Sequence, residues 1–376
     1  MKLDLSPDQE LVRDTTRRFL SERAPLTEVR RLADDAAGYD RGYWRQGAEL
    51  GWTAMLVPEE HGGGSLTGEG LLDLVLVAEE MGRLVSPGPL VPVNVVASAL
   101  GAAGTPAQRA EVLPGLITGD TVAAWCLAEP GGAWGSTDDL AVTAEQTSAG
   151  WVLSGTKGPI EAAAGADHLL VVARTAAGPT QFLVPADTPG VTITALRSLD
   201  LVRRFAEVRF DRTQVPDGAV VGELGGAAAD VERQLLVAIA LQSAETVGVL
   251  DRTFAFTLEY AFDRYSFGRP LASYQALKHR FADLKMWLEA CHATATGAAD
   301  AVQAGTPDAG RLASVAAAYI GERSTAMVQD CVQLHGGIGI TWEHDIHLYL
   351  RRATVNRETY GTPHQHRQRL AALLAA

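Results

Sequence analysis

Polar and apolar positions near the start of the chain predict a helix. Ser6, Pro7 and Gln9 supply an N-cap, a proline at the first helical position and a reciprocal capping residue at the third. A second apolar helix is predicted over 71–84, and the segments 57–64 and 85–92, rich in Gly and Pro, read as loops. Residues 1–120 are therefore expected to form an α-helical domain.

The pattern changes to short strands after residue 120. Segments rich in Val, Ile, Leu and Thr are separated by Gly, Asp and Pro at intervals of about ten residues, namely 140–146, 150–155, 168–174, 180–185, 191–196 and 206–210. This spacing predicts a small β-barrel or sandwich over residues 121–222.

The last region, 223–376, is expected to be helical again. Only three of the 17 prolines follow Pro216, and three long stretches are rich in Ala and Leu, over 227–265, 274–304 and 308–334. The first of them would form a helix of about 60 Å at ~1.5 Å per residue, which is typical of a helical bundle. The pattern as a whole predicts an α+β multi-domain protein with the order helical, β, helical.

Composition narrows the possible partners. Of 376 residues, 47% are hydrophobic and 20% charged, which indicates a folded globular chain. The net charge of −13 argues against nucleic acid and anionic lipid as partners. The three cysteines have apolar neighbours, no apolar run is long enough to span a membrane, and the start is acidic, so we expect a cytoplasmic protein without membrane insertion.

Two segments of the last region carry candidate chemistry. Arg264 and Gln275 flank a Phe-Gly-Arg-Pro turn at 267–270 between two predicted helices, where they could face one extended polar ligand, although an Arg is also favoured at any helix C-terminus. In 333–339, a predicted helix ends in three glycines, of which a helix C-cap explains only one. The nearby histidines lack metal-binding spacing, and no metal is expected.

Earlier in the chain, His-Gly-Gly-Gly at 61–64 is interpreted as a turn, because no nucleophile elbow and no preceding strand accompany it.

The ordered set of motifs resembles the acyl-CoA dehydrogenase family. The matching pieces are VPEEHGG in the first region, LAEPGG and GWVLSGTK in the second, and YAFDRYSFGRPL, YQALKHRFADL and QLHGGIGITWEHDIHLYLRRA in the third. The resemblance covers nearly the whole chain. It implies an N-terminal helical domain, a middle β-barrel and a C-terminal four-helix bundle, with FAD as cofactor, αβ-dehydrogenation of an acyl thioester (acyl-CoA or acyl-carrier-protein) and assembly as a dimer of dimers.

The resemblance also implies roles for particular residues. Arg264 and the Phe267 turn would meet the FAD pyrophosphate of a neighbouring subunit, and the rest of that site would come from Gln275, Gln333, Gly336 and Gly337. Thr362 would touch the cofactor, and Leu127 and Glu129 would lie beside the flavin ring.

Other positions depart from the family pattern. The two places where the family holds its catalytic carboxylate are Tyr360 and Ala238 here. A phenol, whose ordinary pKa is near 10, is a poor base at neutral pH. Glu245, Glu358 and a tuned Tyr360 are the remaining candidate bases, although Glu245 could equally pair with a cation inside the bundle.

Further departures fall on the flavin side. The aromatic residue that covers the flavin in many members is absent from Pro159-Ile160-Glu161, and the Gly-Ser-Asp that follows the Glu-Pro motif is displaced to 135–138.

Two functions follow from these residues. The first is a self-sufficient FAD-dependent acyl-CoA dehydrogenase, with an electron-transfer flavoprotein as the implied electron acceptor. The second is a catalytically incomplete subunit that completes the FAD site of a paralogous partner in a hetero-oligomer, as is known in lipid and steroid catabolism. The sequence leaves the acyl group and the choice between homo- and hetero-oligomer open.

Overall fold

The computed structural model describes residues 5–132, 137 and 139–375. It divides into two compact units, each described by itself below. One comprises the residues up to Arg30, Val75–Ser86 and the chain from Ile239 onward, and the other comprises Arg31–Leu74 and Pro87–Ala238. Residues 135, 136 and 138 of the displaced Gly-Ser-Asp lie outside the described residues.

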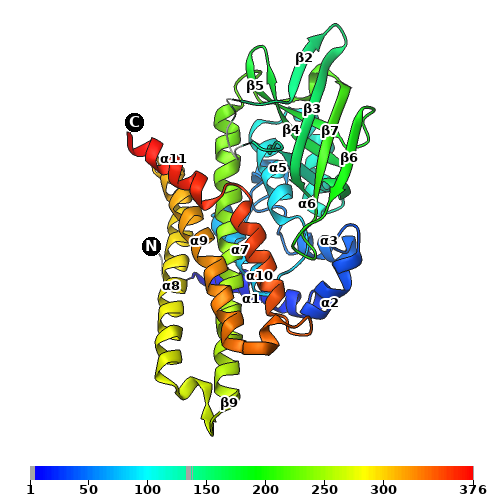
Figure 1. Ribbon diagram of the computed structural model, residues 1–376. Helices are drawn as coiled ribbons and strands as arrows, with labels where there is room; N and C mark the ends of the chain where they lie inside the picture. Colours follow the sequence, from blue (N-terminus) through cyan, green and yellow to red (C-terminus); the bar gives the residue numbers. More distant parts are fainter. Residues whose placement is uncertain (1–4, 133–136, 138, 376) are drawn as a thin grey trace. The chain divides into compact units, whose positions relative to one another are not determined.

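The first unit is helical. It contains α1 (Pro7–Arg23), most of α2 (Leu26–Arg31), the second half of α4 (Gly70–Arg83), most of α7 (Ala228–Asp263), α8 (Gln275–Gln303), α9 (Ala309–His335), α10 (Ile346–Glu358) and α11 (Pro363–Ala375). The short hairpin β9 (Tyr265–Ser266) and β10 (Arg269–Pro270) joins α7 to α8, and Figure 1 shows it at the end of the bundle. The three predicted long helices are confirmed to within two residues at each end.

Local sequence explains how several of these helices begin and cross. The predicted capping box of α1 is present, with Gln9 N donating to Ser6 Oγ and Ser6 N donating to Gln9 Oε1. Helices α4 and α7 approach so closely that a Cβ on Gly82 would collide with the Glu245 carbonyl, and one on Gly248 with the Glu79 carbonyl. Both crossing points therefore require glycine.

The second unit contains the β-region and its helices α3 (Arg41–Glu49), α5 (Leu90–Ala103) and α6 (Pro106–Thr118). Its strands are β1 (Ala123–Cys126), β2 (Thr143–Thr147), β3 (Gly150–Glu161), β4 (His168–Thr175), β5 (Gly178–Pro185), β6 (Val191–Leu196), β7 (Phe205–Val215) and β8 (Val220–Val221). The predicted loop over 85–92 is wrong at its end, because α5 begins at Leu90 and holds Pro92 in its first turn, where proline is tolerated.

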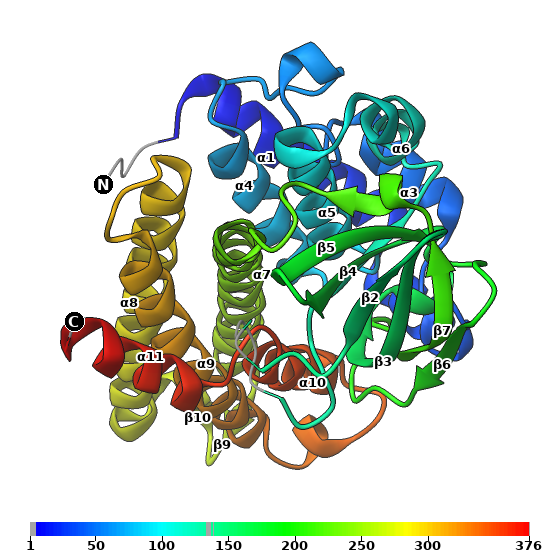
Figure 2. The ribbon, with the colours of Figure 1, turned by 90° about the horizontal axis from the view of Figure 1, so that it is seen from above.

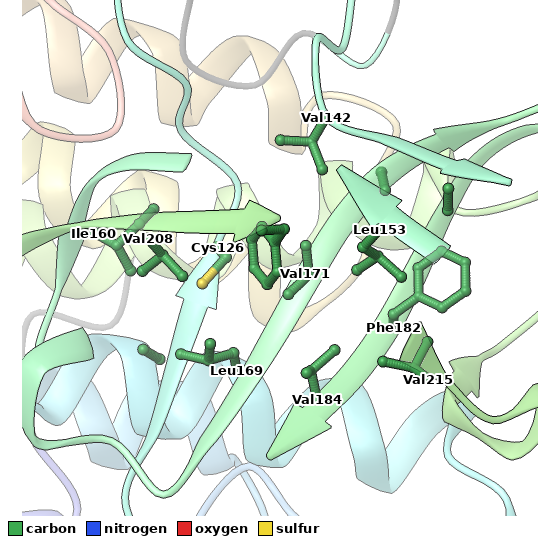
Figure 3. Packing of buried hydrophobic residues seen from close by; sticks show 14 of the residues in the cluster. Cys126, Val142, Leu153, Ile160, Leu169, Val171, Phe182, Val184, Val208 and Val215 are labelled. Carbon is green, nitrogen blue, oxygen red and sulfur yellow. The ribbon is translucent and has the colours of Figure 1, made fainter. Parts of the chain in front are cut away.

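The strands form one eight-stranded sheet in the order β6-β7-β3-β2-β4-β5-β8, with β1 added parallel to β4 (Figure 2). Most pairs are antiparallel, and the long β3–β7 ladder shifts register twice. The inward side chains form one apolar core (Figure 3), which includes Cys126, Leu153, Val171, Phe182 and Val208. The predicted order of helical, β and helical regions is confirmed.

Helix α7 is the one described helix that is long and apolar enough to cross a membrane. Because 83% of its most apolar window is buried, it has the environment of a core helix.

Candidate functional site

Six residues named from the sequence lie at one end of the bundle, and we call them the bundle-end surface: Arg264, Phe267, Gln275, Gln333, Gly336 and Gly337. All six are exposed. The ends of α7 and α9 meet there, because the Tyr260 hydroxyl donates to the His335 carbonyl at 3.3 Å and the two rings stack at 4.5 Å. The structure therefore brings together two motifs that are about 60 residues apart in the chain.

The polar side chains of the bundle-end surface have no hydrogen-bond partner inside the described part of the chain. No described residue forms a hydrogen bond with the side chains of Arg264, Gln275 or Gln333. Gly336 has φ +63 and ψ −141, a conformation suited to glycine, whereas Gly337 has no such backbone requirement. A Cβ on either glycine would meet nothing within 4 Å. The surface thus offers hydrogen-bond donors and open backbone to an external ligand.

Large apolar side chains surround these donors. Phe267 is 98% exposed at the tip of the hairpin with φ +48, which is costly for a phenylalanine, and further exposed apolar residues are Phe262, Tyr265, Ile338, Ile340 and Trp342. So much apolar surface indicates a binding interface. A guanidinium and two carboxamides beside apolar groups fit the pyrophosphate and adenosine of FAD, so the bundle-end surface fits the cofactor that the resemblance implies.

Histidines behind the bundle-end surface are structural. His335 is 3% exposed, its Nδ1 bonds the Cys331 carbonyl at 2.8 Å, and its ring contacts that of His344 at 4.5 Å. Burial lowers the pKa of His335 and of His344, so both remain neutral at physiological pH. No metal-binding group of His, Cys, Asp or Glu occurs in the described residues.

Of the two family base positions, the one at Tyr360 lies in the helical unit, away from the bundle-end surface. Tyr360 is 4% exposed and has φ +57, between the end of α10 and the start of α11. We call residues 359–361 the Tyr360 turn. Thr362 follows this turn and caps the start of α11. Its N donates to Gln365 Oε1 at 2.8 Å, and its Oγ1 accepts from Gln365 N at 3.2 Å. In the other unit, Ala238 is fully buried.

Glu245 is engaged in a buried ion pair. Its Oε1 accepts from Arg352 at 2.6 Å and its Oε2 accepts from Asn356 at 3.0 Å, and all three residues are less than 10% exposed. Arg352 in turn donates to the carbonyls of Val85 and Ser86. These are the contacts of a structural carboxylate. Glu358, in contrast, lies at the surface, and its Oε1 is 3.6 Å from Arg357 Nε.

The Tyr360 turn is held by two side chains that the sequence analysis missed. Gln242 Nε2 donates to the carbonyls of Asn356 and Thr359, at 2.5 and 2.9 Å. His366 Nε2 bonds the Tyr360 carbonyl at 3.1 Å. No sequence motif marks either residue, because both act on backbone carbonyls of a distant segment.

In the β-region, Leu127 and Glu129 lie on one segment after β1. The Leu127 side chain is buried, and its carbonyl accepts from Lys157 Nζ at 3.2 Å. Glu129 accepts from Lys157 at 2.7 Å and from the backbone of Ala141 and Val142. Burial raises the pKa of Glu129, but the Lys157 ammonium and the backbone donors outweigh burial, so the pKa is lower than usual. Glu129 therefore ties its own segment to the backbone of Ala141 and Val142.

The segment that departs from the family at 159–161 also has a local explanation. Glu161 forms a buried ion pair with Arg203, with Oε1 and Nε 2.7 Å apart. Arg203 N donates to Asp200. A buried charged pair thus lies two residues after Pro159, the position at which the resemblance implies the aromatic side chain that covers the flavin.

Comparison with known proteins agrees with this architecture. The acyl-CoA dehydrogenase N-terminal domain matches residues 6–120, the middle domain 124–213 and the C-terminal domain 227–375. The acyl-CoA dehydrogenase IpdE2 of Mycobacterium tuberculosis is 31% identical over 366 residues, 96% of each chain.

Solved structures are similar over the same extent. The butyryl-CoA dehydrogenase of Megasphaera elsdenii has a TM-score of 0.89 and 25% identity, with 100% of both chains covered. The ChsE4–ChsE5 complex from Mycobacterium tuberculosis has a TM-score of 0.88 and 26% identity over 100% of this chain and 99% of that one. The chain belongs to the acyl-CoA dehydrogenase family and is an FAD-dependent oxidoreductase.

Proposed function

We propose that the bundle-end surface binds the pyrophosphate and adenosine portion of FAD in an enzyme that dehydrogenates acyl-CoA thioesters. The observation that carries this proposal is the set of exposed donors, Arg264, Gln275 and Gln333, for which no described residue supplies a partner. A charge-assisted contact from Arg264 to a phosphate would satisfy the strongest of these donors. When bound, FAD supplies the acceptor for the hydride removed from the acyl group.

Assembly with a second chain is the natural consequence of this placement. Phe267, Ile340 and Trp342 are 98%, 81% and 55% exposed, and burying them beside the cofactor requires another surface. We infer a dimer of dimers in which each FAD is shared between subunits. Static light scattering of the FAD-loaded protein tests this, and a monomeric mass at micromolar concentration with FAD bound would contradict it.

The three candidate bases have different environments. Tyr360 is buried at the family position, Glu358 lies at the surface and Glu245 is paired with Arg352. Of these, Glu245 is the least suited, because its ion pair with Arg352 would have to be broken for it to act as a base. Comparing dehydrogenation by Glu245→Gln, Glu358→Gln and Tyr360→Phe identifies the base, since only loss of the base abolishes turnover while FAD remains bound.

The alternative function, an incomplete subunit that serves a paralogous partner, is not favoured by the comparisons. Family models match all three regions of this one chain. Counting bound FAD per chain in the purified protein distinguishes the two functions. One FAD per chain, reduced by an acyl-CoA and reoxidised by an electron-transfer flavoprotein, would support the proposal as a whole. One FAD per chain without such turnover would support only the cofactor assignment.

A further inference from the structure

A buried lysine lies behind the segment that, by the resemblance, belongs beside the flavin. Lys157 is the last residue of the GWVLSGTK motif in β3, and its side chain is fully buried. Its Nζ donates to the Leu127 carbonyl at 3.2 Å and to Glu129 Oε1 at 2.7 Å. A buried ammonium is costly unless it is paired and hydrogen-bonded, and residues 127–129 supply both of these partners. We call these residues the Leu127 segment.

Further hydrogen bonds fix the conformation of the Leu127 segment. Gly158 N, next to Lys157 in β3, donates to the Ala128 carbonyl at 2.8 Å. The Glu129 carboxylate accepts from two backbone N–H groups just before β2, at 2.7 and 3.0 Å. The carbonyls of Leu127 and Ala128 are therefore both bonded to β3, and Lys157 supplies one of these two bonds.

The backbone donors of the Leu127 segment, in contrast, are open to a ligand. No described residue accepts a hydrogen bond from the N–H of Ala128 or of Glu129. Ala128 is 5% exposed, and a buried N–H without a partner is costly. A flavin ring carries carbonyl oxygens and ring nitrogens that accept hydrogen bonds. Two adjacent donors on a fixed backbone fit the edge of such a ring.

We propose that Lys157 is a positioning residue for the flavin, which fixes the Leu127 segment so that the N–H groups of Ala128 and Glu129 donate to acceptor atoms of the ring. This inference rests on the proposed function only for the FAD to which those groups donate. Lys157 acts through the segment and is not a catalytic residue. Donors that face a flavin stabilise its reduced form more than its oxidised form, because reduction adds electron density to the ring. Lys157 therefore makes FAD a stronger acceptor for hydride.

The test replaces Lys157 by methionine in the FAD-loaded protein. Lys157→Met keeps an unbranched side chain in the buried space and removes the ammonium. We expect reduced FAD to lose about 3- to 10-fold more affinity than oxidised FAD, the worth of one neutral hydrogen bond. This is equivalent to a two-electron midpoint potential lower by ~15–30 mV. The potential is measured by anaerobic reduction with dithionite against a reference dye, so no acyl-CoA is needed.

A matched control removes another cation with similar partners. Arg41 donates to two backbone carbonyls, at 3.1 and 2.9 Å, and to the Asp167 carboxylate at 3.2 Å, within the same unit as Lys157. Arg41→Met should leave the potential of FAD unchanged. If Lys157→Met does not fold, its combination with Glu129→Gln removes the unpaired carboxylate and should lower the potential in the same direction.

An unchanged potential in Lys157→Met, or in the combined variant if the single variant does not fold, would overturn the inference. Equal shifts in the lysine variant and in Arg41→Met would also overturn it, because Lys157 would then contribute only to stability. A lower potential in the lysine variant alone, without dehydrogenation by the unmodified protein, would support the inference and contradict the proposed function. Dehydrogenation by the unmodified protein together with an unchanged potential would do the reverse. An unmodified protein that does not bind FAD would contradict both.

Discussion

The two polar regions of the helical unit satisfy their hydrogen bonds in opposite ways. At the bundle-end surface, Arg264, Gln275 and Gln333 point outward, and no described residue bonds their side chains. Around the Tyr360 turn, Gln242 and His366 are bonded to backbone carbonyls, and the nearby Glu245 is held in a buried ion pair.

This difference separates binding from positioning. Exposed donors cost nothing in the free chain, because water satisfies them, and they become valuable only when a ligand arrives. Buried polar groups must be satisfied within the chain, and they therefore fix the shape of the segment that they bond. The bundle-end surface is built to receive an anion from outside, and the Tyr360 turn is built to hold one conformation.

The largest expected effect concerns the side chain at the turn itself. We expect the unmodified chain to bleach FAD slowly with straight-chain acyl-CoAs, because a phenol, whose ordinary pKa is near 10, is a poor general base at neutral pH. Tyr360→Glu should raise the rate by about 10²–10⁴-fold, the usual contribution of general-base catalysis. Anaerobic stopped-flow absorbance measures this, with Tyr360→Phe as the control that stays slow.

Rapid bleaching by the unmodified chain would refute this prediction. If Tyr360→Glu leaves the rate of FAD reduction unchanged, the rate is limited instead by the flavin side of the site, around Pro159 and Glu161.

Breaking the buried pair near the turn should cost the most stability. Arg352→Leu leaves Glu245 as an uncompensated buried charge, so the free energy of unfolding should fall by about 3–5 kcal/mol. The matched control is Arg367→Leu, which breaks an ion pair with Glu322 whose side chains are 53% and 55% exposed. That control should cost about 0–1 kcal/mol. Equal losses in urea unfolding would show that the Glu245 pair is not the buried anchor described above.

Acid should weaken the turn through His366. Its pKa is lowered to about 4 by burial, so the unfolded chain binds this proton more readily than the folded chain. The contribution of His366 is present in full above pH ~6.5 and is lost progressively as the pH falls toward 4. Between pH 7.5 and 4.5 the loss should be about 2–3 kcal/mol. His366→Gln should remove this part of the pH dependence, and an unchanged slope in the variant would refute the assignment.

Sequence patterns were sufficient for most of the elements, and they named the six residues that the structure brings together at the bundle end. Capping residues, the ten-residue spacing of strands and the long Ala-rich stretches predicted most helices and strands, because these depend on local chemistry. The strand β1 was missed, since Ala123–Cys126 is short and buried throughout and shows no alternation. The bundle-end surface was predictable because its residues lie in two compact motifs.

Contacts between distant segments were not predictable from the sequence. Glu245 was weighed both as a base and as one half of an ion pair, but its partner Arg352 lies 107 residues away. Gln242 acts on the Thr359 carbonyl across 117 residues, and a carbonyl leaves no trace in a sequence pattern. The same holds for Glu161 and Arg203, whose pairing depends on the register of β3 against β7.

The central claim is that the bundle-end surface binds the phosphates of FAD, and the affinity of Arg264→Ala for FAD tests it most directly. Losing one charge-assisted contact should weaken FAD binding by about 1.5–3 kcal/mol, roughly 10- to 150-fold in Kd, with little change in the Tm of the cofactor-free protein. Arg269→Ala, in the same hairpin, is the control, because Arg269 stacks on Tyr274 at 3.9 Å and should affect FAD binding little. We predict a selective loss of FAD in Arg264→Ala, whereas equal FAD affinity in the two variants and the unmodified protein would contradict the claim.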